Sequence, residues 1–561
     1  MERINGSEAL LRTLIAEGVE CIFGYPGGQA IPIYDKLYDY RDKLRHVLVR
    51  HEQGATHAAQ GYARVSGKVG VVVVTSGPGA TNTITGIADA MLDSTPLVVI
   101  AGQVPSPLLG TDAFQEVDVI GATLPITKWA YQVRQAEDIA WALSRAFYIA
   151  STGRPGPVVI DLAKDAQVGF VDYVYKPVDY IRSYRPLPPL EPDRIQEAAT
   201  LINKAKRPFA LVGQGVILSG AEQELEQFLD KADIPAGSTL LGLSAMPTDY
   251  RLNKGLLGMH GNMGPNRKTN ECDVLIAIGM RFDDRVTGNV DTYARQAKVI
   301  HLDIDLSEMD KNVKTDVKVL GDAKDSLREI TKLIEPATHT KWINSFAADE
   351  KEEDIKVIKK ELNPEGEYLR MGEVVRKVSE ATGNKAVLVT DVGQNQMMSV
   401  RYFKYSKTRS VVTSGGLGTM GFGLPAAIGA KIGAPKRTVC LFLGDGGMQM
   451  TLQELGTIMQ EKLDVKIILL NNSFLGMVRQ WQELFFKERY SATEMDNPDF
   501  VAIAKAYKIG AREVQKREDL DDAINEMLRY KGSFLLVANV EKCGKVYPMV
   551  PAGGCITEMI F

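Results

Sequence analysis

The fold of this chain follows from residues 438–472, which read TVCLFLGDGGMQMTLQELGTIMQEKLDVKIILLNN. Val439 to Leu443 and Val465 to Leu470 are short apolar runs, and the glycine cluster at 444–447 ends the first of them. Between the runs, Thr451 to Lys462 carries apolar residues at helical spacing. The stretch therefore predicts a strand, a glycine turn, a helix and a second, parallel strand.

Two oxygen-bearing side chains follow the predicted strands. Because the carboxyl ends of parallel strands meet at one edge of a sheet, Asp445 and Asn472 are predicted to lie side by side. A carboxylate and an amide oxygen beside glycines suit Mg²⁺ when phosphate oxygens complete its coordination. For Gly-Asp-Gly alone, a buried strand pair with ordinary turn residues is the better interpretation. The Asn471-Asn472 pair after the second run favours a metal–diphosphate site.

Length and composition limit the class of protein. A chain of 561 residues, 45% hydrophobic, predicts two to four domains, and three fit best. A net charge of −4 with mixed signs gives no basic footprint for nucleic acid. No apolar run approaches the roughly 20 residues that span a bilayer, and the start lacks a signal peptide. Five scattered cysteines indicate a reducing compartment, so a cytoplasmic protein is expected.

Histidine usage restricts the chemistry of the C-terminal part. The chain has six histidines, and none follows His339. That part therefore cannot contribute a histidine to a Ser-His-Asp relay or to a histidine-ligated metal. Chemistry located there is expected to belong to a cofactor.

The strand, turn, helix and strand scheme recurs near the start of the chain. Val69 to Thr75, the turn Ser76–Gly79, the helical segment Ile84 to Leu92 and Pro96 to Ala101 repeat it without the aspartate. A proline-rich connector at 176–192 and a charged segment at 341–366 separate the parts. We therefore expect domains at 1–175, 193–340 and 367–561.

The motifs resemble those of a known family. Gly-Asp-Gly at 444–446 with Asn471-Asn472 is similar to the thiamine-diphosphate signature of thiamine-dependent enzymes. Among these, the motifs at 24–28 (GYPGG), 418–423 (GTMGFG) and 477–481 (MVRQW) resemble the catalytic subunits of acetohydroxyacid synthases, also called acetolactate synthases. The resemblance covers nearly the whole chain. It implies an α/β fold with three doubly wound parallel-sheet domains: pyrimidine-binding, central FAD-binding, and thiamine diphosphate/Mg²⁺-binding.

The activity that the resemblance implies is a carboligation. Pyruvate would be decarboxylated on thiamine diphosphate, and its two-carbon unit transferred to a second 2-oxo acid. The products would be 2-acetolactate or, with 2-oxobutyrate, 2-aceto-2-hydroxybutyrate, in branched-chain amino-acid biosynthesis. The family's site lies between two chains, which implies a homodimer or homotetramer, and members commonly work with a separate regulatory small subunit.

Glu52 is the main catalytic candidate. It stands where a predicted strand meets a helix, and an isolated glutamate there is most often a favourable partner of the helix dipole. The resemblance implies a sharper role, since thiamine's aminopyrimidine needs a carboxylic acid beside N1′ to favour its imino tautomer. The resemblance also places four further residues at the catalytic centre: Gly28, Phe114, Gln115 and Lys164.

Cofactor and substrate residues are carried over in the same way. Around thiamine diphosphate they are Gln394, Asn395, Gly418, Met420, Gly444, Gly446, Gly447 and Met477; around Mg²⁺ they are Asp445, Asn472 and Phe474. Around FAD they are Arg154, Gly213, Gly215, Gly279, Arg281, Asp303 and Asp322; around the second substrate they are Arg285 and Trp481. The turn at 213–215 lacks the third glycine of the dinucleotide fingerprint, so FAD rests on the resemblance. Many relatives have histidine where this chain has Asn395.

Two alternatives remain at this stage. Another thiamine enzyme, such as pyruvate oxidase, a 2-oxo acid decarboxylase or glyoxylate carboligase, shares the signature, although the last lacks the glutamate that matches Glu52. A non-catalytic nucleotide-binding protein would keep only the glycine turns.

Overall fold

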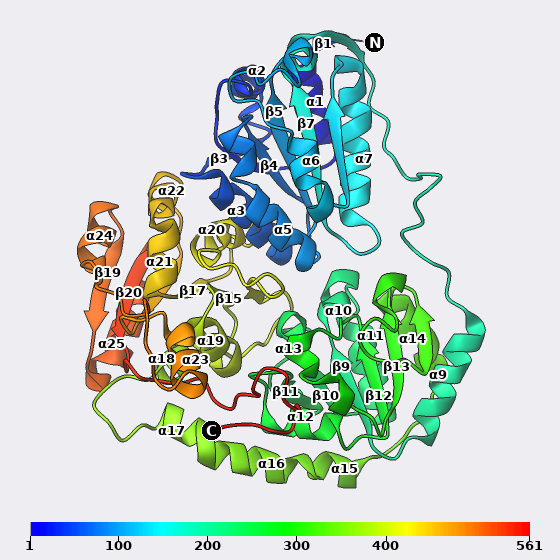
Figure 1. Ribbon diagram of the computed structural model, residues 1–561, viewed down its shortest axis with the longest axis vertical. Coiled ribbons are helices and arrows are strands. Elements are labelled where there is room, and N and C mark those ends of the chain that lie inside the picture. The colour runs from blue at the N-terminus through cyan, green and yellow to red at the C-terminus, as the bar shows by residue number, and fades with distance from the viewer. Residues whose placement is uncertain (1) are drawn as a thin grey trace.

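Three parallel sheets of six strands organise the chain in the computed structural model, which describes residues 2–561 (Figure 1). Helices cover both faces of the sheets. This arrangement confirms the predicted fold class. Figure 1 places the N-terminal sheet at the top, the middle sheet at the lower right and the C-terminal sheet at the lower left.

The N-terminal sheet has the order β3-β2-β4-β5-β7-β6. Its strands are β2 (Cys21–Gly24), β3 (Arg45–Leu48), β4 (Gly70–Val74), β5 (Leu97–Gln103), β6 (Trp129–Val133) and β7 (Pro157–Ala163). The helices that matter for the site are α3 (Glu52–Ser66), α4 (Pro78–Thr81) and α5 (Ile84–Leu92). A small antiparallel pair, β1 (Glu2–Asn5) with β8 (Phe170–Tyr173), brings the two ends of this domain together.

The C-terminal sheet repeats that topology, with the order β16-β15-β17-β18-β20-β19. Its strands are β15 (Val387–Thr390), β16 (Val411–Val412), β17 (Val439–Gly444), β18 (Lys466–Asn471), β19 (Gly510–Val514) and β20 (Phe534–Asn539). In both domains the first strand lies between the second and the third, and the fifth lies at the edge beyond the sixth. The two domains are therefore similar halves, as the recurring sequence scheme predicted.

One predicted helix of this domain differs. The helix expected over 451–462 begins earlier, as α21 (Asp445–Thr451), and a 3-10 turn at Leu452–Glu454 separates it from α22 (Leu455–Gln460). At the break, both carboxylate oxygens of Glu454 accept hydrogen bonds from the backbone N–H of Arg50, at 3.0 and 3.2 Å. A contact with the other domain thus accompanies the interruption.

The middle sheet has the order β11-β10-β9-β12-β13-β14. Its strands are β9 (Pro208–Val212), β10 (Ala236–Ser238), β11 (Asn253–Leu256), β12 (Val274–Ile278), β13 (Lys298–Asp303) and β14 (Val317–Leu320). The direction of strand succession reverses between β9 and β12, which is the order of dinucleotide-binding sheets. A ligand crevice is expected at that reversal.

The N- and C-terminal domains meet through two helices with their backbones in contact. On α3, a Cβ atom at Gly61 would lie 2.0 Å from the carbonyl oxygen of Ala426 on α20 (Gly423–Gly433). A Cβ atom at Gly429 would lie 1.7 Å from the carbonyl oxygen of Ala58. Only glycine permits this approach, and it fixes the spacing between α3 and α20.

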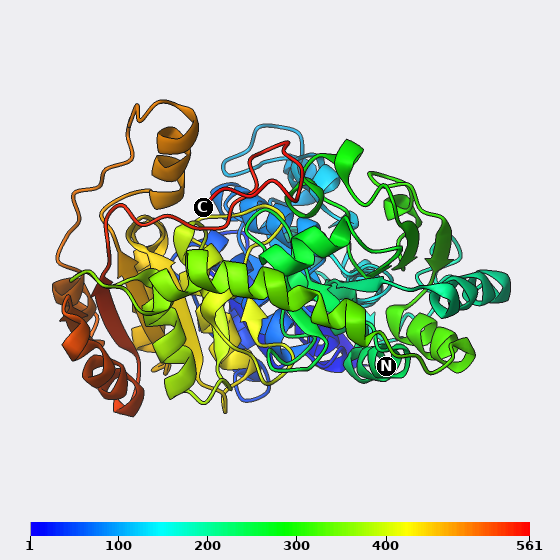
Figure 2. The ribbon, with the colours of Figure 1, turned by 90° about the horizontal axis from the view of Figure 1, so that it is seen from below.

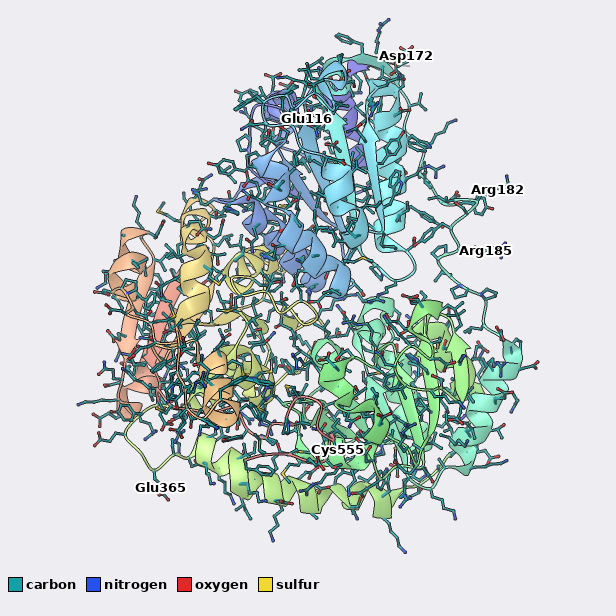
Figure 3. The ribbon with its side chains drawn as sticks, viewed as in Figure 1. Glu116, Asp172, Arg182, Arg185, Glu365 and Cys555 are labelled. Atoms are coloured by element: carbon teal, nitrogen blue, oxygen red, sulfur yellow. The ribbon has the colours of Figure 1, made fainter. Side chains whose placement is uncertain are left out.

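Two connectors and a tail complete the chain. The first connector runs outside the domains towards α9 (Pro192–Lys204), with Arg182 and Arg185 pointing into solvent (Figure 3). The second is a helical strap, α15 (Thr340–Asn344), α16 (Phe346–Glu353), a π-helical turn and α17 (Lys359–Leu362), which crosses from the middle to the C-terminal domain (Figure 2). The tail at 544–561 runs beside this strap and contains no helix or strand. No helix within residues 2–561 has the length and apolar character to cross a membrane.

Candidate active site

The carboxyl edge of the N-terminal sheet brings the predicted catalytic residues together. Gly28 follows β2, Glu52 opens α3, Phe114 and Gln115 follow β5, and Lys164 follows β7. Lys164 Nζ donates a hydrogen bond of 3.3 Å to the carbonyl oxygen of Gly28. Phe114 is 83% exposed. Gln115 adopts a left-handed φ of 59°, and its backbone lies against Gly77.

Asn82 is a member of this edge that the sequence analysis missed. Its Nδ2 donates a hydrogen bond of 2.9 Å to Glu52 Oε2. Asn82 ends α4, directly after the Ser76–Gly79 turn. The turn was visible in the sequence, but its proximity to Glu52 depends on β3 and β4 both ending at this edge. The bond orients the Glu52 carboxyl group and leaves Oε1 close to Gly79.

The carboxyl ends of β17 and β18 lie at one edge, because Gly444 pairs with Leu470 in the parallel register. Asp445 Oδ2 accepts a hydrogen bond of 2.7 Å from Asn497 Nδ2, which also donates to Asn471 Oδ1 at 3.0 Å. Burial raises the pKa of the Asp445 carboxyl group, and its side-chain partner is a neutral amide. A cation at this position would compensate the buried charge. Asn497 was not predicted.

The second predicted metal ligand, Asn472, is linked to α19 (Gln394–Tyr402). Asn472 Nδ2 donates to Gln394 Oε1 at 3.3 Å, while the backbone N–H of Phe474 donates to Asn472 Oδ1 at 3.2 Å. Within residues 2–561 no group of three or more His, Cys, Asp or Glu side chains could hold a metal ion. Mg²⁺ here would therefore require amide, backbone and diphosphate oxygens beside Asp445.

The glycine turn at 444–447 lies beside a polar side-chain atom that has no partner. A Cβ atom at Gly444 would lie 3.4 Å from Asn395 Nδ2, and the buried Oδ1 of Asn395 has no partner. A Cβ atom at Gly446 would lie 3.5 Å from the terminal methyl carbon of Met420, so Met420 lies against this turn. An orphaned polar atom beside unsubstituted glycines fits a polar ligand.

Asp391 holds the Met420 segment and was also missed as a site residue. Its carboxylate is fully buried and accepts hydrogen bonds from the backbone N–H groups of Gly421, at 3.1 Å, and Gly423, at 2.9 Å. Burial raises the pKa of this carboxyl group. Gly421 has a φ of +83°, which favours glycine. Asp391 therefore fixes the turn between Met420 and α20.

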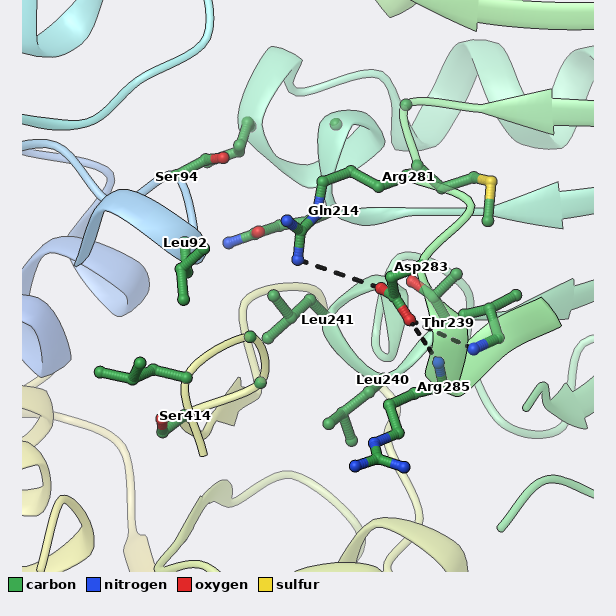
Figure 4. Close-up of a pocket in the computed structure, with 18 of the residues that line it drawn as sticks. Leu92, Ser94, Gln214, Thr239, Leu240, Leu241, Arg281, Asp283, Arg285 and Ser414 are labelled. Atoms are coloured by element: carbon green, nitrogen blue, oxygen red, sulfur yellow. Dashed lines mark hydrogen bonds and ion pairs between the residues drawn. The ribbon is translucent and has the colours of Figure 1, made fainter. Parts of the chain in front are cut away.

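A cavity of about 870 Å³ opens between the three domains (Figure 4). The predicted residues that line it are Arg154, Gly215, Gly279, Arg281, Arg285, Asp303, Asp322, Gly418, Met477 and Trp481. Gly213 packs behind this wall, because a Cβ atom there would lie 2.2 Å from the carbonyl oxygen of Gly279. The residues at the carboxyl edge of the N-terminal sheet, which we call the Glu52 edge, do not line the cavity. Asp445 and Asn472, which we call the metal edge, do not line it either.

The cavity lies at the reversal point of the middle sheet. The turn at 213–215 follows β9 and Gly279 follows β12. A Cβ atom at Gly215 would lie 2.6 Å from the Cα atom of Gly279, and Gly279 has a φ of +56°. Asp303 ends β13, and burial raises its pKa to about 6. These features fit a dinucleotide whose pyrophosphate approaches the glycine backbone.

Two predicted FAD residues have protein partners as well. Arg154 Nη1 donates to Asp305 Oδ2 at 3.1 Å and to Glu308 Oε1 at 2.8 Å. Asp322 caps α14 (Ala323–Leu333) by accepting from two backbone N–H groups. Both side chains therefore have structural roles in addition to lining the cavity.

Arg285 presents its guanidinium group to the cavity. Asp283 accepts hydrogen bonds from the backbone N–H groups of Arg285 and Val286 and also lies 4.0 Å from the guanidinium group of Arg281 (Figure 4). The nearest carboxylate to Arg285 is that of Asp284, at 3.8 Å. Trp481, on α23 (Gly476–Phe485), is half-buried, and its ring centroid lies 5.0 Å from that of Phe485. Arg285 is thus available for an anionic ligand.

Comparison with known proteins agrees with this geometry. Models of the thiamine pyrophosphate enzymes match the chain three times: the N-terminal TPP binding domain at residues 4–122, the central domain at 195–330 and the C-terminal TPP binding domain at 391–538. The fold and the site thus define a thiamine pyrophosphate enzyme.

Relatives that match over nearly the full length of the chain identify the family within the thiamine pyrophosphate enzymes. The acetolactate synthase large subunit of Lactococcus lactis is 44% identical over 558 residues, which cover 99% of this chain and 96% of that protein. The large subunit of Escherichia coli acetolactate synthase isozyme 2 is 43% identical over 560 residues, covering 99% of both. The chain belongs to the acetolactate synthase large-subunit family. This membership confirms the resemblance and the predicted thiamine-dependent carboligase.

Proposed function

We propose that this chain joins two 2-oxo acids with loss of carbon dioxide. Pyruvate is the donor, pyruvate or 2-oxobutyrate is the acceptor, and the product is 2-acetolactate or 2-aceto-2-hydroxybutyrate. The observation that carries this choice is that Arg285, from the middle domain, and Trp481, from the C-terminal domain, line the same cavity. A guanidinium group pairs with the carboxylate of a 2-oxo acid, and an indole contacts its alkyl group.

Thiamine diphosphate and Mg²⁺ are the proposed cofactors at the C-terminal edge. Asp445, Asn472 and the backbone at Phe474 would hold the metal, and the glycine turn at 444–447 would admit the diphosphate. The bound cofactor supplies an electron sink for decarboxylation. Glu52, oriented by Asn82, would exchange a proton with N1′ of the pyrimidine ring. Met420 would support the shape of the cofactor.

FAD is the proposed ligand of the middle domain. The close glycine backbone at Gly215 and Gly279 and the polar wall of Arg281 and Asp303 support this assignment. The proposed reaction has no net redox change, so the flavin would not cycle.

A second copy of the chain is proposed to complete the site. The Glu52 edge and the metal edge are on different domains, and neither lines the cavity. Phe114, beside Gln115, is an exposed aromatic side chain that a partner copy would cover. We therefore propose a homodimer or homotetramer. A small regulatory subunit is proposed because the relatives are called large subunits.

Product analysis tests the function. The protein would be incubated with pyruvate and 2-oxobutyrate in the presence of Mg²⁺, thiamine diphosphate and FAD, while flavin absorbance is followed. We expect both acetohydroxy acids and an unchanged flavin spectrum. Acetaldehyde alone would favour a decarboxylase, flavin bleaching in proportion to product would favour an oxidase, and no turnover would favour a non-catalytic protein.

A further inference from the structure

One loop of the C-terminal domain is shared by both proposed cofactor sites. It runs from Ser414, after β16, to Met420, before α20. Ser414 to Gly418 line the central cavity, whereas Met420 lies against Gly446 at the proposed diphosphate turn. The conformation of this loop therefore bears on both sites at once.

The loop is held from the N-terminal domain by two buried carboxylates. Asp89 lies on α5 and Asp93 directly follows it, and both are fully buried. Asp93 accepts hydrogen bonds from the backbone N–H groups of Gly415, at 2.9 Å, and Gly416, at 2.6 Å. Its negative charge is matched by Arg64, whose Nη2 lies 2.6 Å from Asp93 Oδ2.

A single carboxylate oxygen of Asp89 accepts hydrogen bonds from residues near both ends of the loop. Its Oδ1 accepts hydrogen bonds from the hydroxyl group of Ser414 and, at 2.9 Å, from that of Thr419. The four residues between them include three glycines, and Gly418 has a φ of +69°. A segment so rich in glycine has high conformational entropy unless its ends are fixed.

The cost of burying Asp89 indicates that the carboxylate serves more than packing. Its Oδ2 has no hydrogen-bond partner, and Arg64 is bonded to Asp93 instead. Burial, together with the nearby charge of Asp93, raises the pKa of Asp89 to about 6. A buried carboxyl group without a cationic partner of its own is unfavourable for stability.

We propose that Asp89 is a positioning residue for both cofactor sites: from the N-terminal domain it closes the loop Ser414–Met420 and sets its shape. This inference rests on the proposed function, because it assumes that FAD occupies the cavity and thiamine diphosphate the Gly446 turn. It predicts that one distant carboxylate controls the affinity for two separate cofactors.

Binding measurements on the full chain test this inference. Apo-protein variants Asp89→Ala and Asp89→Asn would be titrated with FAD, by flavin fluorescence, and with thiamine diphosphate and Mg²⁺, by equilibrium dialysis. The matched control is Asp161→Asn: Asp161 is also fully buried in the N-terminal domain, with its pKa raised to about 6, but its side-chain partners are Gln103 and Gln132.

We expect Asp89→Ala to weaken both cofactors at least about tenfold, since two hydrogen bonds to a charged acceptor are lost. Asp89→Asn retains an acceptor oxygen and should recover most of the affinity. The visible circular dichroism of bound flavin should change in Asp89→Ala, and the KM for thiamine diphosphate should rise more than kcat falls. The control should keep both affinities within about twofold of the parent protein.

Unchanged affinities in Asp89→Ala, with a melting temperature lowered as in a packing defect, would overturn the proposal. If Asp89→Ala does not fold, Thr419→Val removes one donor and leaves the carboxylate. Weakening of both cofactors in that variant supports the proposal, and unchanged binding overturns it. A parent protein that binds both cofactors without forming acetohydroxy acids would refute the proposed function alone.

Discussion

Replacing Gly429 with alanine is expected to force helices α3 and α20 apart. The added Cβ atom would lie 1.7 Å from the carbonyl oxygen of Ala58, half the 3.4 Å at which ordinary contact begins. To restore ordinary contact, the two helices must therefore move apart by about 1.7 Å at this point. Both clashing groups belong to helical backbones, so no rotamer change relieves the overlap. Because α3 begins at Glu52 and α20 follows Met420, the shift reaches residues proposed for the site.

Two opposing terms set the size of the effect. Alanine in place of glycine inside a helix contributes about 1 kcal/mol of stability. Overpacking of a closely packed contact typically costs about 1–3 kcal/mol, and a backbone overlap of this size belongs at or above the upper end. We expect a net loss of roughly 2 kcal/mol, which lowers the melting temperature of domains of this size by about 4–8 °C.

Differential scanning calorimetry and product formation from pyruvate would measure both consequences. The matched control is Gly366→Ala, because a Cβ atom at Gly366 would meet no atom within 4 Å and its backbone φ is not positive. The control should melt and turn over like the parent protein. If Gly429→Ala melted within about a degree of the parent, at full activity, the spacing argument would be wrong.

Three further predictions concern site residues, and a fourth concerns the buried carboxyl group of Asp161. Glu52→Gln should slow turnover and C2 proton exchange of bound thiamine by roughly 10²–10⁴ without altering the melting temperature, and an unchanged exchange rate would exclude Glu52 as the acid–base group. Asp445→Ala should abolish Mg²⁺-dependent binding of thiamine diphosphate in a titration, and undiminished affinity would remove Asp445 from the metal site. Trp481→Leu should shift the ratio of acetohydroxybutyrate to acetolactate, within roughly 10- to 200-fold, when both acceptors compete; an unaltered ratio with a lowered melting temperature would return Trp481 to a packing role. The raised pKa of Asp161, about 6, means that its contribution to stability is present below its unfolded pKa and lost as pH rises through 6. Relative to Asp161→Asn, the parent should therefore lose up to about 3 kcal/mol of unfolding free energy between pH 4 and pH 7. Denaturant unfolding at the two pH values measures this, and an equal difference in unfolding free energy between the two proteins at both pH values would contradict it.

Local sequence patterns predicted the buried strands well. The strands predicted at Val439–Leu443, Val465–Leu470 and Val69–Thr75 are β17, β18 and β4, each within one residue at either end, and the helix at Ile84–Leu92 has the predicted bounds. Each strand is an apolar run ended by glycine or a polar residue. The ends of a buried strand can therefore be predicted from the neighbouring residues in the sequence. The strand predicted at Pro96–Ala101 extends to Gln103 as β5, because residues 102 and 103 pair with Leu162 and Ala163 of β7.

The residues of the candidate site also fall into two groups, those that the sequence predicted and those that it did not. The positions of Glu52, Asp445 and Asn472 after predicted strands placed them at sheet edges, and the resemblance supplied their roles. Asp391 also directly follows a strand, β15, but no motif gave it a role. Asn82 and Asn497 carried no comparable signal, because each is a single polar residue in a turn or loop whose role depends on the group that it contacts across the site.

The sequence by itself determined the three parallel-sheet domains, the glycine turns and the family, because strand burial and tight turns depend on residues close together in the chain. The tertiary structure alone decided which polar groups hold those turns. Asp89 meets Ser414 across 325 positions of sequence, and Gly429 meets Ala58 through backbone contact between domains. Such contacts depend on how separate domains pack, and no local periodicity records that packing.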